Sequence, residues 1–266
     1  MAKTLIVYST QDETSVEMAK IVRNLADFEA AEKFNSLKRF RSGDTEMLEI
    51  TGLHIDASYM DQYKSDLIVF LSKHSSSKGI SSLTVHAEGN WSDKAELGGM
   101  PHQLSFSSPL SMLQLLKSMK SISAAGLDVT YEATHHGPLL KTPSLFVELG
   151  GNEEVMKNRE YLGIVAQSVV RLINDDTDSD FTKIVVGIGS NHYSSKFTSI
   201  ALGRGYAFAH IMPRFYTFEY EMLGQAFERS TPKPENAVID WKSIRSEERD
   251  KIINKLNELG MDYERI

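Results

Sequence analysis

The amino-acid sequence predicts an α/β fold, a three-layer sandwich of helices around a largely parallel or mixed β-sheet. Short apolar runs alternate with helical patterns along the chain. Several of these runs are continuously apolar, which is typical of strands covered on both faces. No internal repeat or long low-complexity linker divides the 266 residues. We therefore expect a single α/β domain over residues 1–266, with a small N-terminal lobe over 1–50 and a C-terminal helical extension over 237–266 as candidate subdivisions.

Seven segments have the composition of strands. Val, Ile, Leu, Thr and aromatic residues make up half or more of each, and polar or glycine-containing stretches separate them. The predicted strands are 4–9, 66–72, 83–87, 128–134, 145–149, 183–189 and 206–211.

Four amphipathic helices are predicted between and after these strands. Apolar residues recur in each at spacings of three, four and seven, which places them on one helix face. Thr14 and Glu17 have the spacing of a capping box for the first helix, and Ser108-Pro109 suits the start of the second. The third is expected after Asn152. The apolar faces cover 18–25, 112–119, 162–169 and 252–259.

The composition excludes several classes of protein. Because the chain has no cysteine, it has no disulfide, thiolate zinc site or cysteine nucleophile, and a reducing cytoplasmic setting is expected. The net charge of −7 argues against a general nucleic-acid binder but allows a local basic surface that holds RNA. No apolar stretch approaches the roughly 20 residues that cross a bilayer, and "MAKTLIVYST" lacks the organisation of a signal peptide. We expect no membrane association, a cytoplasmic location and a monomer.

Most of the histidines occupy one kind of position. Six of the eight lie at or directly after the carboxyl ends of predicted strands, namely His74, His86, His135, His136, His192 and His210. Ligands of open α/β sheets bind in the crevice beyond those ends. If most of these strands run parallel, one edge of the sheet carries a ring of imidazoles, and we expect a shared site there.

Tight turns and one carboxylate accompany these histidines. Exposed backbone N–H groups in such turns can hold a phosphate or an oxyanion. The turns contain Gly89-Asn90, Gly137-Pro138 and Gly189-Ser190-Asn191. Glu148 lies within the apolar strand 145–149, so we expect its carboxylate to be buried and paired with a cation, a histidine or a metal.

The segment "YEATHHGPLL" places His135 and His136 directly before Gly137-Pro138. Adjacent residues of a strand point to opposite faces, so both histidines can face one site only if the strand ends before them. Gly137-Pro138 favours such an early end. We expect one imidazole to reach the crevice and the other to orient it or to cap the turn.

Two chemistries fit histidines and a carboxylate without cysteine. Neutral imidazoles and Glu148 can hold zinc, which lowers the pKa of a bound water to about 7. Alternatively, a histidine can act directly as a general base on water, with turn N–H groups stabilising the oxyanion. No HExxH motif supports a zinc geometry, and no GxSxG motif supports a serine triad.

A protein of a different class is suggested by "IVYSTQDETSVEMAKIV" (6–22), which is similar to the first strand, phosphate loop and helix of a flavodoxin. In that alternative Ser9, Thr10 and Thr14 would hold a flavin phosphate at the helix N-terminus. The loop contains no glycine, which favours an ordinary capped strand–helix turn.

Seven motifs together resemble the archaeal and plant-type D-aminoacyl-tRNA deacylase family, of the D-tyrosyl-tRNA deacylase type. In chain order they are "SKHSS" (72–76), "SLTVHAEGN" (82–90), "LGGMP" (97–101), "YEATHHGP" (131–138), "FVELG" (146–150), "GIGSNHY" (187–193) and "GYAFAHIMP" (205–213). They keep the order of the family over roughly residues 66–213, and the last 50 or so residues contribute little to the resemblance.

The resemblance implies a phosphorylase/hydrolase-like fold and a zinc-dependent hydrolase. The implied reaction cleaves the ester between a D-amino acid and the 3′ end of tRNA, which makes tRNA the implied partner and zinc the implied cofactor. A rival interpretation of the same histidines is a zinc-dependent hydrolase of a small amide or ester, whose activity would not depend on the tRNA.

With this resemblance, the candidate site residues fall into three groups. The catalytic candidates are His74, His86, His135, His136 and Glu148. The metal-ligating candidates are His86, His136, Glu148, His192 and His210. The substrate-binding candidates are Lys73, Ser75, Asn90, Gly137, Gly189, Asn191, Lys196 and Arg204, and Lys73, Lys78, Lys196 and Arg204 are the candidates for holding phosphates.

Overall fold

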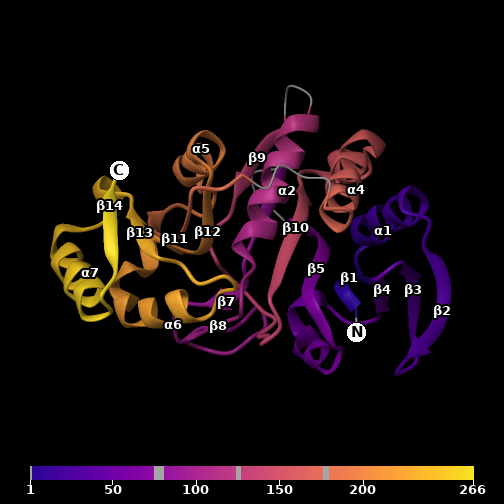
Figure 1. Ribbon diagram of the computed structural model, residues 1–266, viewed down its shortest axis with the longest axis horizontal. Helices are drawn as coiled ribbons and strands as arrows, with labels where there is room; N and C mark the ends of the chain where they lie inside the picture. The colour runs from indigo at the N-terminus through magenta and orange to yellow at the C-terminus, as the bar shows by residue number, and fades with distance from the viewer. Residues whose placement is uncertain (1, 75–80, 124–126, 176–179) are drawn as a thin grey trace.

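The structure is a computed structural model that describes residues 2–74, 81–123, 127–175 and 180–266. These residues form an eight-stranded sheet and a four-stranded sheet with helices on their faces (Figure 1). A two-stranded ribbon of β7 (Gly89–Asn90) and β8 (Gln103–Leu104) accompanies them. The predicted α/β class is confirmed.

The larger sheet is mixed. In spatial order its strands are β2 (Glu29–Phe34), β3 (Leu37–Ser42), β4 (Thr45–Ile50), β1 (Ala2–Ser9), β5 (Ser65–His74), β10 (Ser144–Gly150), β6 (Ser82–His86) and β9 (Asp128–Tyr131). The four central strands β4, β1, β5 and β10 run parallel, whereas β6 runs antiparallel to β10. Strand β9 is parallel to β6. The carboxyl ends of β5 and β6 therefore point in opposite directions.

Apolar side chains on alternate positions of the larger sheet divide its core into two layers. The helices on one face are α1 (Glu13–Leu25), α2 (Pro109–Ile122) and α4 (Arg159–Ile173). They pack on residues such as Ile6 and Val69. On the other face Val7 and Phe70 pack against the 3₁₀-helix η1 (His54–Gln62). The sheet thus has helices on both faces, as a three-layer sandwich requires.

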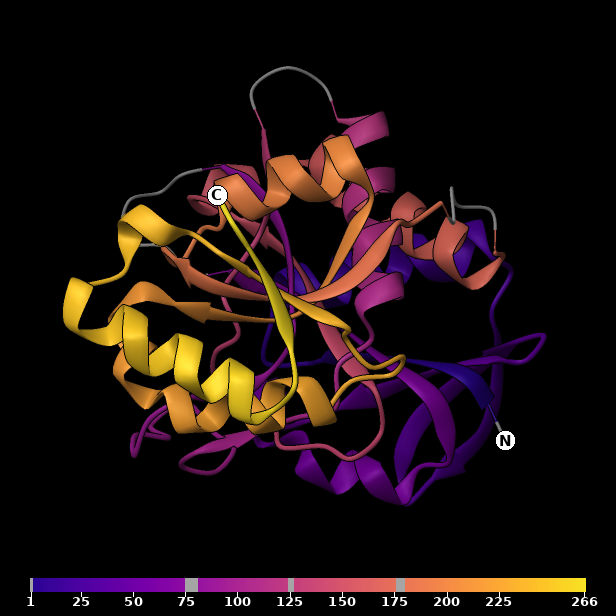
Figure 2. The ribbon, with the colours of Figure 1, turned by 60° about the vertical axis from the view of Figure 1, so that its left-hand side comes forward.

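The smaller sheet is parallel, with β12 (Tyr206–Pro213), β11 (Lys183–Ser190), β13 (Asn236–Ile239) and β14 (Asp262–Arg265) in that order. Helix α5 (Ser195–Arg204) packs on one face of it through Phe197 and Phe208. The other face carries η2 (Arg214–Met222), α6 (Leu223–Glu228) and α7 (Ser246–Glu258), as Figure 2 shows from the side of the C-terminus. Two short helices, α3 (Glu153–Met156) and η3 (Trp241–Ser243), complete the helical segments that the structure describes.

All seven predicted strands are present, as β1, β5, β6, β9, β10, β11 and β12. Strand β9 ends at Tyr131, three residues earlier than predicted. The other seven strands that the structure describes were not predicted, namely β2, β3, β4, β7, β8, β13 and β14. Segment 1–50 contributes β1 to β4 to the larger sheet, and segment 237–266 contains strands on both sides of α7.

The helix starts require two corrections. The side chain of Asp12, not the Thr14–Glu17 pair, caps α1, because Asp12 Oδ1 accepts hydrogen bonds from the backbone N–H groups of Thr14 and Ser15. Asn152 caps the short α3, and Asn158 caps α4.

The segment that follows β9 joins the two sheets. Its Ala133 N–H donates to the carbonyl of His192, and its Thr134 N–H donates to the carbonyl of Ile211. In return, Ser194 N–H donates to the carbonyl of Tyr131. This segment places the residues after β9 between the ends of β5 and β11. No helix among the described residues is long and apolar enough to span a membrane.

Candidate active site

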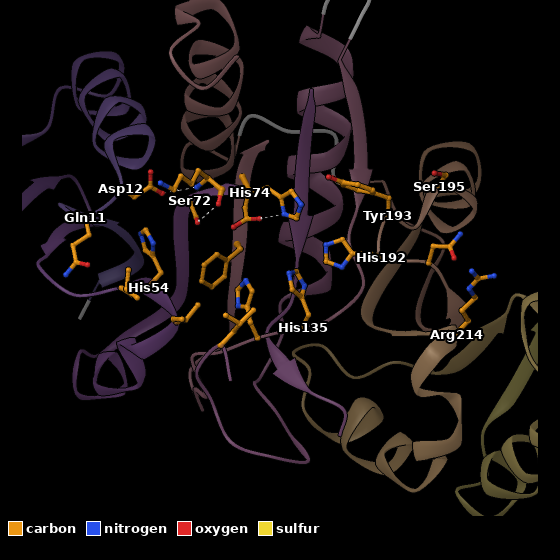
Figure 3. A pocket seen from close by; sticks show the side chains of 18 residues that line it. Gln11, Asp12, His54, Ser72, His74, His135, His192, Tyr193, Ser195 and Arg214 are labelled. Carbon is orange, nitrogen blue, oxygen red and sulfur yellow. Dashed lines mark hydrogen bonds and ion pairs between the residues drawn. The ribbon is translucent and has the colours of Figure 1, made fainter. Parts of the chain in front are cut away.

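A cavity of about 1060 Å³ lies where the two sheets meet (Figure 3). Its walls come from the start of α1, the residues around the start of η1, the end of β5, the middle of β10, the segment after β9 and the loop after β11. The titratable residues that line it are Asp12, His54, Lys73, His74, His135, His136, Glu148, His192, Tyr193 and Arg214. The fold thus brings five of the histidines to one cavity.

The expectation of a single parallel sheet edge is wrong, although the shared site exists. His74 at the end of β5 pairs in register with Gly150, whereas His86 at the end of the antiparallel β6 pairs with Phe146. Glu148 lies between these two levels on β10. Its Oε2 is 3.4 Å from His74 Nδ1 and 3.7 Å from His86 Nε2. Opposed strands therefore place the two imidazoles on either side of one carboxylate.

A second buried carboxylate, Glu132, lies behind the cavity wall. Its oxygens are 3.2 Å from His74 Nδ1, 3.2 Å from His192 Nε2 and 3.6 Å from His135 Nε2. Neither oxygen has a hydrogen-bond partner of good geometry among the described residues, and the same is true of His86 Nε2. Unpartnered buried polar atoms are costly unless a further group satisfies them, and here the group would be a cation.

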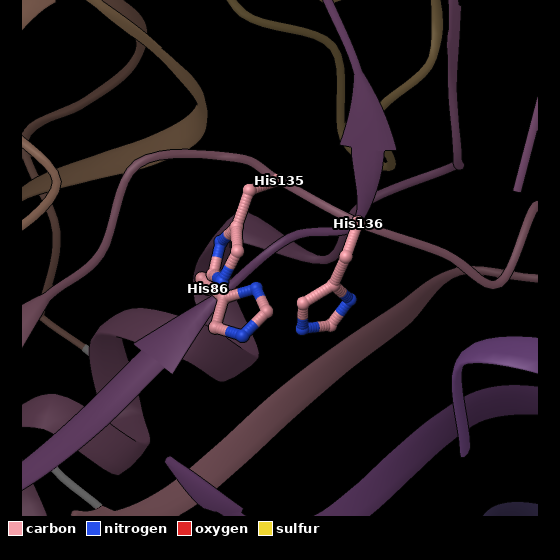
Figure 4. Close-up of side chains that lie close together, drawn as sticks. All are labelled: His86, His135 and His136. Carbon is pink, nitrogen blue, oxygen red and sulfur yellow. The ribbon is translucent and has the colours of Figure 1, made fainter. Parts of the chain in front are cut away.

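His135 and His136 both line the cavity, so the expectation that only one of them reaches it is wrong. Because β9 ends at Tyr131, strand alternation no longer applies at these positions. The backbone of His136 has φ of +46°, in the left-handed region, which turns this residue away from an extended path. Together with His86 the two imidazoles form a compact cluster (Figure 4).

Backbone carbonyls fix the orientation of all three imidazoles in this cluster. Nδ1 of His86 lies 3.1 Å from the carbonyl oxygen of Ala87, and Nδ1 of His135 lies 2.8 Å from that of Ala133. Nδ1 of His136 contacts the carbonyl oxygen of Gly137 in the same way. A carbonyl only accepts, so each Nδ1 carries the proton. In a neutral ring Nε2 is then left as a lone-pair donor, as in protein zinc sites. His135 and His136 offer this atom directly, whereas His86 offers it once the proton on its Nε2, which lies 3.7 Å from Glu148 Oε2, is released.

Two of the histidines at the site have a lowered pKa and two have a raised one. Burial lowers the pKa of His136 to about 3 and holds that of His135 well below its usual range, with the neighbouring His86 adding to both effects. Burial also opposes protonation of His86 and His74, but the close carboxylates of Glu148 and Glu132 outweigh it. They raise the pKa of His74 and bring that of His86 to about 9. Burial raises the pKa of Glu148, yet the close imidazoles of His74 and His86 leave it lowered.

Three groups of side chains can each present ligand atoms within 4.8 Å of one another. They are His86–His135–His136, His74–Glu132–His192 and His86–Glu132–Glu148. Shared members link the groups into one continuous cluster of five histidines and two glutamates. The cluster has the nitrogen and oxygen donors of a metal site without cysteine.

His210 is not part of this site, which corrects the metal-ligating prediction for it. Its Nδ1 lies 3.3 Å from Thr134 Oγ1, and its Nε2 lies 2.9 Å from the carbonyl oxygen of Arg229. Both ring nitrogens therefore have partners inside the protein. Burial lowers its pKa to about 4, so it remains a neutral structural histidine.

Two of the predicted phosphate-binding residues form ion pairs instead. Lys196 Nζ is 2.6 Å from Asp240 Oδ1, and Arg204 Nη1 is 3.8 Å from Glu264 Oε2. Neither lines the cavity. Lys73 and Asn191 do line it, and Ser75 and Lys78 lie outside the described residues.

The predicted turn residues have structural roles. Asn90 donates from Nδ2 to the carbonyl of Gly98, and Gly137 donates its N–H to the carbonyl of Leu97. A Cβ on Gly137 would lie 2.2 Å from the nitrogen of Gly99, so glycine is required there by close backbone packing. At Gly189, with φ of +101°, a Cβ would lie 2.6 Å from the hydroxyl of Ser243. None of these three positions lines the cavity.

Sequence reasoning missed Glu132, His54 and Arg214. Glu132 lies in the apolar run "VTYEA", so the argument that singled out Glu148 would also have found it. His54 follows no predicted strand, so no signal of that kind could have found it. Arg214 lies three residues after the predicted strand 206–211, as His192 does after 183–189, but the argument considered only histidines at such positions.

Comparison with known proteins identifies the family. The model of a family described as D-aminoacyl-tRNA deacylase matches residues 61–264. The chain belongs to this family. A D-aminoacyl-tRNA deacylase of Pyrococcus furiosus is 34% identical over 253 residues, which are 92% of each chain. One of Methanosarcina barkeri is 34% identical and covers 97% of this chain and 88% of its own.

A crystal structure described as a conserved protein of unknown function superposes on the chain with a TM-score of 0.91. It is 28% identical and covers 99% of this chain and 95% of its own. The resemblance seen in the seven motifs is thus confirmed for the D-aminoacyl-tRNA deacylase family. The family match extends to residue 264, so the last 50 residues also belong to it.

Proposed function

We propose that this protein hydrolyses the ester between a D-amino acid and the 3′-terminal ribose of tRNA, releasing the D-amino acid and free tRNA. The observation that carries the proposal is that ring nitrogens of His86, His135 and His136 lie within 4.8 Å of one another, with His135 and His136 lining the cavity. Such an array can place a reactive water next to an ester carbonyl. Membership of the D-aminoacyl-tRNA deacylase family supports the substrate class.

We also propose that the cofactor is zinc. His86, His135 and His136 would hold it through Nε2, and their Nδ1–H groups already donate to backbone carbonyls. Bound zinc would lower the pKa of its water to about 7 and so supply a nucleophile at neutral pH. With a pKa of about 3, His136 is a weak proton acceptor, which favours a ligand role over the direct general-base alternative.

A further titratable group of the cavity can supply the proton that the leaving ribose oxygen takes up. His74 lines the cavity, and the charge of Glu148 favours the protonated imidazole. A protonated His74 can give its proton to the ribose oxygen that leaves as the ester breaks. Glu132 contacts His74 and His192 and would stabilise positive charge on both.

The 3′ end of the tRNA would reach the cavity over a rim that contains cationic and aromatic side chains. Arg214 lines the cavity, and the next residues of η2 include Phe215 and Phe218, which are 51% and 53% exposed. Tyr216 lies between them, with its ring centroid 4.8 Å from that of Phe215. Exposed aromatic rings stack readily on unpaired bases, and a single-stranded 3′ end offers such bases.

Replacement of Phe215 and Phe218 by Ala should raise KM for D-aminoacyl-tRNA by about 10-fold or more, because each lost stacking contact costs about 1–3 kcal/mol. The kcat should change little, since neither ring touches the imidazole cluster. Steady-state kinetics on D-tyrosyl-tRNA and on the minimal ester D-tyrosyl-adenosine would check this. An equal rise of KM for both substrates would exclude contacts with bases upstream of the terminal adenosine.

The experiment that tests the function is deacylation of matched D- and L-tyrosyl-tRNA, with and without a chelator. We expect the D-ester to be hydrolysed at least about 10-fold faster than the L-ester, and thorough chelation to remove at least about 99% of the activity. Equal rates for the two esters would overturn the proposed function. D-specific activity that survives chelation would overturn only the metal.

A zinc-dependent hydrolase of a small amide or ester is the second candidate, because the same histidines would serve it. Hydrolysis of a free D-tyrosine ester as fast as D-tyrosyl-tRNA would favour it. The flavodoxin-like alternative is weakened because Asp12 already occupies the N–H groups at the start of α1. We further expect a cytoplasmic monomer, which light scattering and cell fractionation would test.

A further inference from the structure

His54 is a buried imidazole in the cavity wall that the catalytic cluster does not use. Its side chain is 6% exposed, and its ring lies edge-on to Phe70 and Phe146 with centroid distances of 6.0 Å in both cases. Figure 3 shows it on the opposite side of the cavity from His192. The ring nitrogens of a histidine in such an apolar wall are costly to bury unless they have hydrogen-bond partners.

Ser15 determines which nitrogen of His54 carries the proton. The single hydroxyl proton of Ser15 is donated to the carbonyl of Leu71 at 2.6 Å. Its Oγ is 3.4 Å from His54 Nε2 and can therefore only accept from it. Nε2 is then protonated, and Nδ1 is a lone-pair acceptor without a hydrogen-bond partner among the described residues. Burial lowers the pKa of His54 to about 4, so this neutral tautomer persists at neutral pH.

The distance of His54 from the reaction centre limits what it can contact. The ring of Phe146 lies between it and the cluster, 5.2 Å from the ring of His86 and 4.9 Å from that of His136. The α-amino nitrogen of an aminoacyl ester stays about 2.5 Å from the ester carbon, because only the α-carbon separates them. A donor that meets His54 while the ester carbonyl meets the cluster must lie several bonds further away.

The walls around His54 suit a flat apolar ring with one amino group. Leu53 and Leu97 line the same cavity and are 48% and 58% exposed, and Ile55 lies beside them. Large exposed apolar side chains at a cavity favour a partner that covers them. Lys73 lines the same region and can hold a phosphate next to such a ring.

We propose that His54 Nδ1 accepts a hydrogen bond from the exocyclic amino group of the 3′-terminal adenine, so that the cavity wall at Leu53, His54 and Ile55 binds this base. The proposal rests on the proposed function, since it assumes that an aminoacylated tRNA end enters the cavity. The terminal adenine is common to all tRNAs, so this contact would serve every D-aminoacyl-tRNA alike. His54 thereby becomes a substrate-binding residue that positions the ester.

The test combines one protein change with one substrate change. Wild type and His54→Phe are compared on D-tyrosyl-tRNA that ends in adenosine or in purine riboside, which lacks only the amino group. For wild type, loss of the amino group should lower kcat/KM by about 3- to 10-fold, the effect of one hydrogen bond. His54→Phe should lose a similar factor on the adenosine substrate and show no further loss on the purine substrate. Ser15 keeps its bonds to Ser9 N–H and the Leu71 carbonyl in this variant, so the fold should be retained.

Each alternative outcome has a defined meaning. If the loss caused by His54→Phe and the loss caused by removing the amino group multiply when both changes are combined, His54 does not contact the amino group. The proposal is then overturned. If the His54→Phe loss disappears with D-phenylalanyl-tRNA instead, the donor is the tyrosine hydroxyl, which also overturns the adenine assignment. If His54→Phe does not fold, as its melting curve would show, His54→Leu serves in the same comparison. Failure of the proposed function would differ from all of these, because wild type would then hydrolyse D-tyrosyl-tRNA no faster than L-tyrosyl-tRNA.

Discussion

Replacement of Glu148 by Gln is expected to lower kcat/KM for D-tyrosyl-tRNA by about 10³-fold. The carboxylate is buried and contacts both His74 Nδ1 and His86 Nε2. Its charge favours the protonated form of His74 that would assist the leaving oxygen, and general acid catalysis is typically worth 10²- to 10⁴-fold. The amide has the shape of the carboxylate without its charge, so the loss would come from the electrostatics. Single-turnover deacylation would measure it.

Glu88→Gln is the matched control for this experiment. Glu88 is also fully buried, and its Oε2 accepts a hydrogen bond from Ser144 rather than from a histidine. Burial raises its pKa to about 8, so at pH 7 it is protonated and Gln is close to the native group. We expect its activity to stay within about twofold of wild type. Similar losses of activity in the two variants would mean that replacing any buried carboxyl group impairs the enzyme. The catalytic role assigned to Glu148 would then be wrong.

His135→Ala and His136→Ala should each lower kcat by about 10²-fold or more and reduce the bound zinc per chain. Both imidazoles line the cavity, and both have Nδ1 fixed by a backbone carbonyl. Loss of either removes one of the three ligands that would hold the metal. Elemental analysis of the purified variants gives a measurement that is independent of activity. Near-normal metal content together with mild losses would assign both residues to the turn.

His102→Ala is the control for these two variants. This imidazole is 43% exposed, and Nε2 lies 3.3 Å from Glu219 Oε2, away from the cluster. Exposed ion pairs of this kind contribute little to the stability of the fold. The variant should therefore keep its metal content and activity.

Strand prediction succeeded for the longer apolar runs and failed for strands that are short or carry charged residues. Strands β5 and β10 are covered on both faces, and their apolar runs are visible in the sequence. Strands β2 and β3 form an antiparallel hairpin at the edge of the sheet with mostly exposed or half-buried residues. Edge strands tolerate charged residues, so a segment such as "LKRFRS" carries no apolar signal.

Site prediction succeeded for residue types and failed for partners. His135 and His136 were selected because they follow the end of a predicted strand, and Glu148 because a carboxylate in an apolar strand needs a partner; all three line the cavity. His210 was assigned wrongly to the site, because Thr134 and Arg229 satisfy it from distant parts of the chain. Lys196 and Arg204 have acidic partners at Asp240 and Glu264, and charge alone does not indicate such pairs.

By itself the sequence determined the α/β class, seven of the strands, the absence of thiol chemistry and the histidines that could form a site. These features follow from local periodicity and residue chemistry, which a linear pattern contains. Only the tertiary structure decided that β6 runs antiparallel to β10, which places His86 across Glu148 from His74. It also brought Glu132 and His54 to the same cavity from segments with no common motif. Strand direction and long-range contacts depend on how the whole chain packs, so no local pattern specifies them.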